Sequence, residues 1–444
     1  MFKESNIYTG IHKNYITPIA DLLFGTRVDY YCRYIKKMNN FSKQKINAWQ
    51  NKMLRQLITH AYENTEYYRI LFDRNNINPY SIKTKSDLKL IPSLTKEDIR
   101  NNYNSLIPEN IDKIKHLKAS TGGSTGVPLK YLLDIHTWSF HIANGIVNWQ
   151  RSGYNYGDKY LALGSTSLFV NKSQPFKIWM YYKLKRKIGL CGIVMSDKIC
   201  EEYLDIINKH NVTFIYGYAS SIFLLAKYAI KKNIEIYIRA CFPTSEILTD
   251  NYRSTIAKAF NCEVLNSYGA RDGGISSFEH KKGFHEVSYN SIVNLVDVDN
   301  SNIGSSSLTS LLNLAMPLIN YDHGDAYRIN EERNKDYPYN GQIINEIIGR
   351  TSDVIRLVNG NVLTGPGFTI LFRDLPVEKY SIEIDKDTSI LCKIKKLPDY
   401  SESDEKIIIE TISKHAGEGI TIKIEYVEDF ELTNSGKRSY FFVK

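Results

Sequence analysis

The chain has 444 residues, of which 43% are hydrophobic and 24% are charged. This length exceeds one ordinary hydrophobic core, so we expect two or three structural units, and the composition is that of a soluble globular protein. The formal net charge is +9, but basic and acidic residues are interspersed, and the longest basic run covers only residues 183–187. This pattern argues against a nucleic-acid-binding protein.

The six cysteines are scattered along the chain, and no Cys-x-x-Cys spacing occurs. The scatter argues against a disulfide framework or a zinc ribbon and is typical of a reducing cytosol. The N-terminus lacks the apolar core of a signal peptide. Residues 16–24 are apolar, but Pro18 and Asp21 interrupt them, and the stretch is too short to span a bilayer. We therefore expect a cytoplasmic protein without a transmembrane segment, which could still work beside a membrane.

Residues 1–110 are expected to form a mostly helical lead-in. Residues 48–72 carry apolar side chains at helical spacing, among them Trp49 and Tyr62, which predicts a buried helix face rather than a site. Thr95 stands just before Glu97 and Asp98, a pattern that predicts an N-cap followed by a helix with acids in its first turn.

Residues 120–130 read Ser-Thr-Gly-Gly-Ser-Thr-Gly-Val-Pro-Leu-Lys and lie between two predicted strands, residues 115–119 and 130–133. Glycine lets backbone N–H groups turn toward a ligand, hydroxyls suit phosphate oxygens, and Lys130 adds a positive charge. The spacing is not that of a Walker A loop, which needs Gly-Lys-Ser/Thr leading directly into a helix. Taken alone, the loop is equally typical of a turn in a surface hairpin, so both interpretations stay open here.

From residue 192 onward, predicted strands alternate with predicted helices. Strands are expected there at residues 193–195, 212–216, 237–242 and 263–267, and helices at residues 197–210, 220–232 and 249–260. Before this region, a helix is expected at residues 137–151 and a short buried strand at residues 159–163. The alternation predicts a parallel, doubly wound sheet, in which ligands bind beyond the carboxyl ends of the strands. Two polar clusters, residues 244–246 and 268–272, fall at such ends and are therefore candidate binding residues.

The remainder of the chain is richer in predicted strands. They are expected at residues 288–297, 308–314, 354–358, 362–363, 380–384, 390–395 and 421–427, with a helix at residues 402–415. Asn359-Gly360 between two apolar runs predicts a β-hairpin turn. The fold class is thus α/β. Residues 1–348 are expected to form a large N-terminal domain with mostly parallel, doubly wound sheets and a β-rich subdomain, and residues 349–444 a small mobile α+β domain joined at residues 349–353.

Five segments match, in order, the motifs of one family. Residues 121–128 match a Thr-Ser-Gly-Ser/Thr-Thr-Gly-x-Pro phosphate loop, and residues 268–272 match Tyr-Gly-x-Thr-Glu or Tyr-Gly-x-Arg-Glu. Residues 321–325 match Tyr-x-Thr-Gly-Asp, and residues 349–353 match Gly-Arg-x-x-Asp. Residues 434–437 match a C-terminal Gly-Lys element. With these motifs the chain resembles the adenylate-forming superfamily of acyl-CoA ligases and adenylation domains. Within it, the compact phenylacetate–CoA-ligase-like branch, with its relatives in capsular polysaccharide biosynthesis, is the most similar.

The resemblance implies a reaction in which a carboxylate attacks the α-phosphate of ATP, giving an acyl-adenylate and pyrophosphate, before a second nucleophile takes the acyl group. It implies ATP and Mg²⁺ as cofactors and a small-molecule carboxylic acid as substrate. The acceptor is either coenzyme A or a group on a sugar or another small molecule. Tyr216 and Tyr218 follow a predicted strand at the active edge and are our candidates for the wall of the acid pocket.

The resemblance also implies the nucleotide contacts. The triphosphate residues are Thr121, Gly122, Gly123, Ser124, Thr125 and Gly126, with Lys130 after them; the adenine-side residues are Thr244, Ser245, Glu246, Tyr268 and Gly269; and the ribose residues are Asp325 and Arg350. The two oxygens of the Asp325 carboxylate suit both ribose hydroxyls. Without the family pattern, Asp325 is more typical of a turn residue, and Arg350 and Asp353 are more typical of an ordinary surface pair.

Three residues are implied in catalysis. Asp272 would hold Mg²⁺, and Arg350 would add a ribose or phosphate contact. Lys437 would reach the α-phosphate and the substrate carboxylate from the small domain, and leave when that domain rotates about Asp353. Lys437 near a chain end is otherwise typical of a solvated lysine. Three histidines, His280, His285 and His323, do not have the spacing of a zinc site and are predicted to be turn or core residues.

Two positions depart from the family pattern. Gly122 replaces a serine and removes a hydroxyl donor, and Asp272 replaces a glutamate that is one methylene longer. These departures leave room for a slow or degenerate enzyme. The alternatives are a nucleotidyl transferase that passes AMP to its substrate, and a non-catalytic nucleotide-binding partner in polysaccharide assembly. Retention of Asp325, Arg350 and Lys437 argues against the second. We expect no nucleic-acid partner, and a homodimer stays open.

Overall fold

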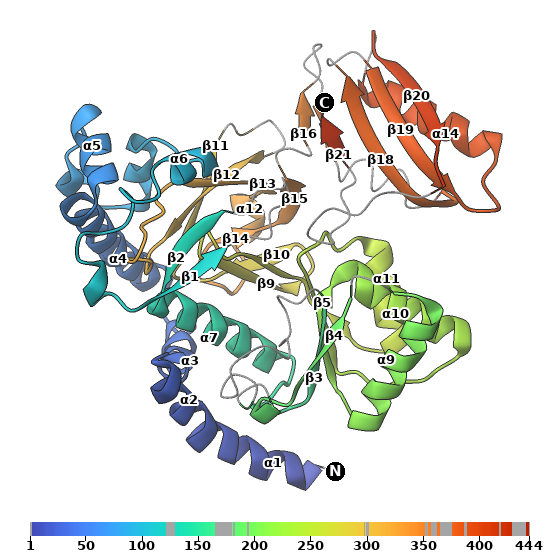
Figure 1. Cartoon of the computed structure of the whole chain (residues 1–444), viewed down its shortest axis with the longest axis horizontal. Coiled ribbons are helices and arrows are strands. Elements are labelled where there is room, and N and C mark those ends of the chain that lie inside the picture. Colours follow the sequence, from blue (N-terminus) through green and yellow to red (C-terminus); the bar gives the residue numbers. More distant parts are fainter. Residues whose placement is uncertain are drawn as a thin grey trace.

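The structure is a computed structural model. It describes residues 2–120, 129–164, 180, 183–192, 195–296, 298, 302–350, 354–356, 362–364, 375–385, 389–416, 419–428 and 441–443. In Figure 1 helices from the first part of the chain flank the central sheets, and a separate sheet from the C-terminal part lies at the other end of the view.

The predicted helical lead-in is confirmed. Its elements are α1 (Phe2–Ile11), the π-helical turn η1 (His12–Ile16), α2 (Thr17–Phe24), α3 (Val28–Met38), α4 (Lys43–Asn64), α5 (Glu66–Arg74), η2 (Pro79–Ser81), η3 (Lys85–Leu90), α6 (Lys96–Asn101) and η4 (Ile111–Lys113). Thr95 caps α6 as predicted, since its side chain accepts a hydrogen bond from Asp98 N. Residues 48–72, however, are not one helix. Thr65 has an extended backbone and caps the start of α5, a break that apolar periodicity continues straight across.

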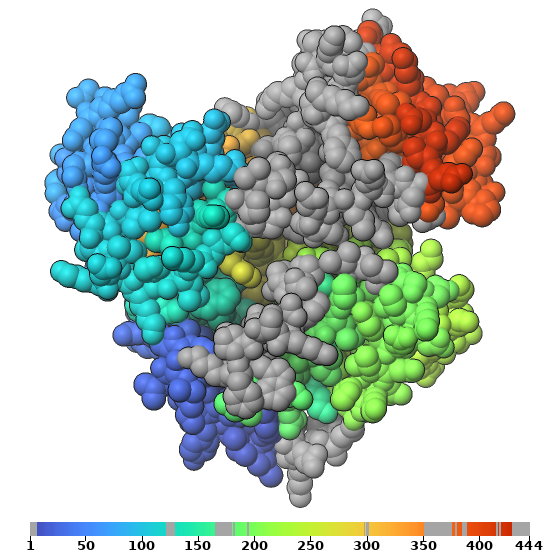
Figure 2. Space-filling view, viewed as in Figure 1, coloured from blue at the N-terminus to red at the C-terminus, as the bar shows by residue number. Residues whose placement is uncertain are grey.

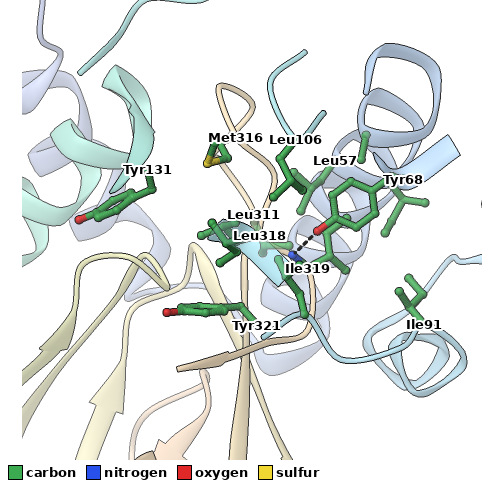
Figure 3. Close-up of a cluster of buried hydrophobic side chains, with 14 of the residues drawn as sticks. Leu57, Tyr68, Ile91, Leu106, Tyr131, Leu311, Met316, Leu318, Ile319 and Tyr321 are labelled. Carbon is green, nitrogen blue, oxygen red and sulfur yellow. Dashed lines mark hydrogen bonds between the residues drawn. The ribbon is translucent and has the colours of Figure 1, made fainter. Parts of the chain in front are cut away.

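Helices α4, α5 and α6 pack around residues 311–321, which lead into the strand that carries the 321–325 motif. The buried Tyr68 is central to this contact. Its hydroxyl accepts a hydrogen bond from Ile319 N at 3.0 Å, which Figure 3 shows, and it also donates one to Pro317 O at 3.1 Å. Leu94 forms a parallel bridge to Tyr321. The lead-in, which carries no recognised motif, therefore fixes the start of the motif strand.

The largest sheet has nine strands within the described residues and is mixed. Its strands are β3 (Tyr160–Gly164), β4 (Lys187–Cys191), β5 (Phe214–Tyr218), β6 (Ala240–Thr244), β7 (Glu263–Val264), β8 (Ser267–Ala270), β9 (Ile275–Lys281), β10 (Phe284–Val287) and β14 (Ile343–Ile344). The order β4-β3-β5-β6-β8 is parallel, and β9, β10 and β14 continue it antiparallel. The strand predicted at residues 193–195 was wrong for Met195, and residues 193–194 lie outside the described residues. The strand that the structure has just before these residues is β4, which ends at Cys191.

Helices cover both faces of the parallel part, as the doubly wound prediction required. On one face α9 (Asp197–His210), α10 (Ala219–Lys232) and α11 (Asp250–Phe260) bury Ile215 and Cys241. On the other, α7 (Ile135–Arg151) lays Trp149 flat on Phe242, with ring centroids 4.6 Å apart. Side chains of alternate residues in each strand point to opposite faces of the sheet, and helices cover both faces. These strands are therefore apolar almost throughout.

A second, antiparallel sheet has the order β11-β12-β13-β15. Its strands are β11 (Ser291–Val296), β12 (Ile303–Ser310), β13 (Tyr321–Arg328) and β15 (Glu346–Arg350), with the short helix α12 (Glu331–Asn334) between the last two. The strand predicted at residues 308–314 was placed too late, because residues 311–319 form the segment that packs on the N-terminal helices. A hairpin of β1 (His116–Ser120) and β2 (Lys130–Asp134) stands where two strands were predicted.

The C-terminal part has a sheet of its own, with four strands among the residues that the structure describes. It consists of β18 (Val377–Asp385), β19 (Ser389–Lys396), β20 (Thr421–Tyr426) and β21 (Phe441–Val443), with α14 (Glu402–Ala416) packed on it around a separate core; β16 (Val354–Arg356) and β17 (Val362–Thr364) pair as the predicted hairpin. The boundary at residues 349–353 remains a proposal, since residues 351–353 lie outside the described residues. Among the described helices, none combines the length and the apolar character needed to cross a membrane.

Buried histidines make the stability of this fold depend on pH. His285 on β10 is 4% exposed, and its Nε2 lies 3.9 Å from Glu279 Oε1. Burial lowers the pKa of His285 to about 4, with Glu279 opposing the shift and Arg253 adding to it. The unfolded side chain has a pKa of about 6.5, so below that pH the unfolded chain binds a proton that the folded chain does not. Stability contributed by the neutral ring is therefore present above about pH 6.5 and falls as the pH drops toward 4.

We expect the free energy of unfolding to decrease between pH 6.5 and 4, and His285→Gln to reduce the slope by about 1.4 kcal/mol per pH unit. His12, His141 and His280 also have lowered pKa values, so the parent slope contains their shares too. Denaturant unfolding at several pH values measures both slopes. Parallel curves for the parent and the variant would show that His285 titrates normally in the folded protein.

Candidate nucleotide and acid site

Two parallel strands end side by side, next to the start of a third, where the sequence places polar clusters. Tyr218, the last residue of β5, pairs with Thr244, the last residue of β6, and Thr244 pairs in turn with Ser267 at the start of β8. The register places Thr244 opposite Ser267, the residue before Tyr268, although 23 residues separate the paired positions in sequence. These residues lie at the carboxyl edge of the parallel strands, the position at which such sheets bind ligands.

The 321–325 motif reaches the same edge through side-chain contacts. Asp325 on β13 is 7% exposed, and its Oδ2 accepts a hydrogen bond of 2.5 Å from the Tyr268 hydroxyl. Burial, and the neighbouring Asp325 and Tyr327, raise the pKa of Tyr268 well above its usual value, so its phenol keeps the proton that it donates. The structure therefore brings together two motifs that are 57 residues apart.

Two further side chains complete a hydrogen-bonded cluster around this contact. Tyr327 Oη lies 2.5 Å from Tyr268 Oη, and His323 Nε2 lies 3.0 Å from the same oxygen and 3.3 Å from Asp325 Oδ2. His323, Asp325 and Tyr327 alternate along β13 and so project from one face of the strand. His323 was predicted to be an ordinary turn or core residue, and its contact with two candidate site residues was missed.

Arg350 lies opposite Asp325. The two residues are Cα partners in the antiparallel pairing of β13 with β15. Gly324, between His323 and Asp325, has φ +85°, a left-handed conformation that favours glycine. It lies in the irregular part of the β12–β13 pairing, between Asp322 and Ala326. The ribose residues inferred from two separate motifs thus occupy facing backbone positions, and the side chain of Arg350 lies outside the described part of the structure.

Asp272 lies just beyond β8 and is 9% exposed. Its Oδ2 accepts a 2.7 Å hydrogen bond from the hydroxyl of Tyr321, a fully buried residue of the core around Tyr68. Within the described ranges, no group of three or more His, Cys, Asp or Glu side chains is placed to hold a metal ion. A single oriented carboxylate nevertheless fits Mg²⁺ that arrives with a nucleotide, because such sites use one or two carboxylates together with substrate phosphates.

Arg271, beside Asp272, belongs to the candidate cluster 268–272, but no individual role was assigned to it from the sequence. Its guanidinium carbon is 5.2 Å from the centre of the Trp138 ring, and Trp138 stacks on His141 with centroids 6.3 Å apart. Burial, and to a smaller extent the charge of Arg271, lower the pKa of His141 to about 4, so this ring is neutral near pH 7. The 268–272 motif, which contains Arg271, could have indicated a role for this residue. The helical spacing of Trp138 and His141 indicated only a helix face.

The adenine-side candidates take two different positions. Thr244 is buried at the end of β6, whereas Ser245 is exposed and has φ +67°. Glu246 turns back toward the neighbouring helix, where its Oε2 accepts a 2.7 Å hydrogen bond from Ser220 N. Ser220 is in the first turn of α10, so Glu246 satisfies a helix N-terminus, a structural role that the sequence did not suggest.

Several candidates lie outside the described residues. These are the phosphate-loop residues Thr121, Gly122, Gly123, Ser124, Thr125 and Gly126, the hinge residue Asp353 and the catalytic candidate Lys437. Lys130 is described: it begins β2, pairs with Ser120 and is exposed. The loop therefore connects the two strands of a hairpin, as predicted.

Comparison with known proteins agrees with the fold and the motifs. No family model matches the chain. A solved structure of 2-hydroxyisobutyryl-CoA ligase, in the postadenylation state with 2-HIB-AMP, has a TM-score of 0.69 at 15% identity and covers 90% of this chain and 89% of that one. The chain thus has the fold of the adenylate-forming ligases.

Sequence comparison finds proteins that are similar to this chain over most of its length. Protein CapK of Staphylococcus aureus is 25% identical over 441 residues, which cover 97% of this chain and 96% of CapK. A phenylacetate-coenzyme A ligase of Aromatoleum evansii is 23% identical over 376 residues, covering 80% of this chain and 81% of that protein. The chain is therefore similar over most of its length to CapK and to the phenylacetate-coenzyme A ligases.

Proposed function

We propose that this protein is an adenylate-forming acid ligase that activates a carboxylic acid with ATP and transfers the acyl group to coenzyme A or to another small-molecule acceptor. The observation that carries the proposal is the contact of Tyr268 with Asp325 at the carboxyl edge of the sheet, with Arg350 opposite Asp325. It joins three of the five family motifs in one place. Relatives named as phenylacetate-coenzyme A ligases, and ligase structures that hold 2-HIB-AMP and CoA, support the same reaction type.

The proposed chemistry assigns a task to each group. An oxygen of the acid attacks the α-phosphorus of ATP, a P–O bond forms, and pyrophosphate leaves. Asp325 would hold the ribose, and the neutral phenol of Tyr268 would keep that carboxylate oriented. Asp272 would hold Mg²⁺, which supplies charge neutralisation on the phosphates when bound. Lys437 would stabilise the developing charge on the α-phosphate.

The relatives also bear on which group accepts the acyl group and on the pathway in which the protein acts. The whole-length similarity to Protein CapK supports a role in capsular polysaccharide assembly, where the acceptor would be a group on a sugar. The phenylacetate–CoA-ligase relatives support coenzyme A. We propose the acyl-adenylate as the shared intermediate of both routes.

The test is ATP–pyrophosphate exchange over a panel of carboxylic acids, followed by mass spectrometry of products formed with and without coenzyme A. We expect one class of acid to stimulate exchange. A thioester would assign coenzyme A as the acceptor, whereas an acyl-adenylate that accumulates would indicate a different one. ATP binding without exchange for any acid would contradict the ligase proposal and favour a nucleotide-binding partner.

Asp272→Ala is expected to raise the Mg²⁺ concentration needed for half-maximal exchange by at least about tenfold, since loss of even an indirect metal partner costs about 10–100-fold in affinity. Asp272→Glu should be tolerated or should improve turnover, because the longer carboxylate matches the family pattern. Mg²⁺ titrations of the exchange reaction measure both.

Tyr321→Phe is the matched control, because it removes only the hydroxyl that orients Asp272 and keeps the buried ring. It should shift the Mg²⁺ requirement in the same direction by less. If the alanine variant at position 272 titrates like the parent, the metal is held elsewhere.

A further inference from the structure

Arg271 carries a positive charge to which the proposed chemistry assigns no task. It is an exposed residue and begins the turn between β8 and β9, which Gly274 N closes by donating to Arg271 O at 3.2 Å. The adjacent carboxylate, Asp272, accepts its hydrogen bond from Tyr321. Among the described ion pairs, arginines that contact a carboxylate are Arg33, Arg69, Arg151, Arg253 and Arg328, and Arg271 is not one of them.

The turn that carries Arg271 is packed closely on the second sheet. A Cβ atom at Gly273 would overlap the side chain of Leu308, and one at Gly274 would overlap that of Ser310. Leu308 and Ser310 both belong to β12, the neighbour of the strand that carries the 321–325 motif. Only glycine allows so close an approach, so the backbone below Arg271 is held in place by packing.

The side chain of Arg271 lies on the face of the sheet that α7 covers. Successive residues of a strand point to opposite faces. Tyr268 points to the β13 cluster, whereas a Cβ atom at Gly269 would lie 3.7 Å from His141 Cε1 on α7. Arg271, two positions after Gly269, extends over Trp138 of the same helix. The proposed ribose contacts and Arg271 are therefore on opposite faces of β8.

The contact with Trp138 leaves the donors of Arg271 available. The guanidinium carbon lies 5.2 Å from the centre of the ring, an arrangement that uses the face of the guanidinium and not its edge. The N–H groups point outward from that edge, and none of them donates a hydrogen bond among the described contacts. A planar fork of this kind matches the two oxygens of a carboxylate.

The titratable groups that the charge of Arg271 reaches, besides His141, are neutral or positive. Burial raises the pKa of Tyr131 on β2 and of Tyr216 on β5, and the charge of Arg271 opposes the rise in both. Burial, then Lys185, then Arg271 lower the pKa of Lys187 on β4 to about 8. Both phenols therefore keep their protons near pH 7, and an anion bound here would meet positive charge.

Tyr131 and Tyr216 mark two sides of this position. Tyr131 is the second residue of β2, the strand that follows the phosphate-loop sequence, and Tyr216 is a candidate for the wall of the acid pocket. The Tyr216 ring lies 5.4 Å from that of Trp149 on α7, so it is on the same face as Arg271. In the space-filling view of Figure 2 yellow residues, the colour of β9 and β10 in Figure 1, show near the centre between teal and green residues.

We propose that Arg271 binds the carboxylate of the acid substrate on the α7 face and holds it beside the α-phosphate of ATP. The inference rests on the proposed ligase function. A carboxylate must approach a phosphate of the same charge, and a guanidinium between them offsets the repulsion. In the proposed mechanism Lys437 arrives only when the domains close, so the carboxylate needs a cation on the large domain before that.

The test is the KM for the acid and the KM for ATP in ATP–pyrophosphate exchange, with the panel acid that gives the fastest exchange. Arg271→Gln removes the charge and keeps a polar side chain. It should raise the KM for the acid about 10–100-fold, because a charge-assisted hydrogen bond is lost, and change the KM for ATP by less than about threefold. Arg271→Lys, which keeps the charge without the fork, should have an intermediate KM for the acid.

The neutral amide of the same acid separates recognition of the charge from the shape of the pocket. As a competitive inhibitor it should bind the parent and Arg271→Gln equally well, because it has no negative charge for the guanidinium to meet. Arg333→Gln is the matched control, since Arg333 on α12 is also exposed and lies 4.8 Å from the centre of the Phe284 ring. Its KM values should stay within about twofold of the parent.

The outcomes distinguish this inference from the proposed function. A parent protein that shows no exchange with any acid would overturn the ligase proposal, and this inference with it. Where the parent is active, the role of Arg271 is overturned if Arg271→Gln keeps the parent KM for the acid. It is also overturned if the KM for ATP rises instead, since the guanidinium would then bind the phosphates. Equal weakening of the acid and its amide, or an equal effect in Arg333→Gln, would likewise contradict recognition of the carboxylate.

Discussion

Replacing Asp325 by alanine is expected to lower kcat/KM for ATP by about two to four orders of magnitude. The carboxylate is proposed to accept both ribose hydroxyls, and a hydrogen bond to a charged group contributes about 1.5–3 kcal/mol. Two such bonds amount to about 3–6 kcal/mol, and each 1.4 kcal/mol is a factor of ten. Because Asp325 is buried against Tyr268, its loss also leaves a phenol without its acceptor. ATP–pyrophosphate exchange at varied ATP concentration measures the effect.

Asp322→Ala is the matched control, since Asp322 lies on the same strand but on the face opposite to Asp325. Its carboxylate accepts only a local bond from Gly324 N among the contacts described, so its kcat/KM should stay within about fivefold of the parent. Tyr268→Phe should fall between the two, because it keeps the Asp325 carboxylate and removes one donor that orients it. Unchanged ATP affinity in a folded Asp325→Ala protein would remove this residue from the nucleotide site.

The position of Thr244 beside the 268–272 cluster was predictable because it follows from a local rule. Alternating strands and helices build a parallel sheet, and the carboxyl ends of parallel strands lie at one edge. The β13 cluster was not predicted, although His323, Asp325 and Tyr327 have the two-residue spacing of a strand face. Gly324 and the acidic residues around it are rare in strands, so the segment was not assigned as one.

Other contacts depend on packing between distant segments. Sequence periodicity placed Tyr68 on a helix, but it could not show that its hydroxyl would hold the backbone of residues 317–319. Arg271 lies within the 268–272 motif, yet its contact with Trp138 depends on how α7 lies across the sheet. The helix break at Thr65 is local, but a cap of this kind leaves the apolar period unchanged on both sides. The contacts of Tyr68 and Arg271 depend on how distant segments pack together, which a single sequence does not specify.

Lys437→Ala is expected to slow adenylate formation by about two to three orders of magnitude, as judged from the loss of a single donor to a developing oxyanion. Lys437 belongs to the Gly-Lys motif in the part of the chain between β20 and β21, which is outside the described residues. In our proposal the small domain delivers this lysine to the α-phosphate only when the domains close. The interaction then belongs to the transition state more than to the ground state, so ATP affinity should change little.

The two half-reactions separate this role from a general loss of function. Acyl transfer from a supplied acyl-adenylate should continue in the alanine variant, because Lys437 is proposed to have moved away by then. Lys423→Ala on β20 is the control, since it removes an equivalent charge from the same C-terminal sheet and should affect neither step. Both half-reactions are measured on one preparation of each variant. Equal slowing of the two steps, or a collapse of ATP binding, would mean that Lys437 is not a mobile adenylation residue. Rotation about Asp353 would then lose its main support, and a nucleotide-binding partner in polysaccharide assembly would become the better hypothesis.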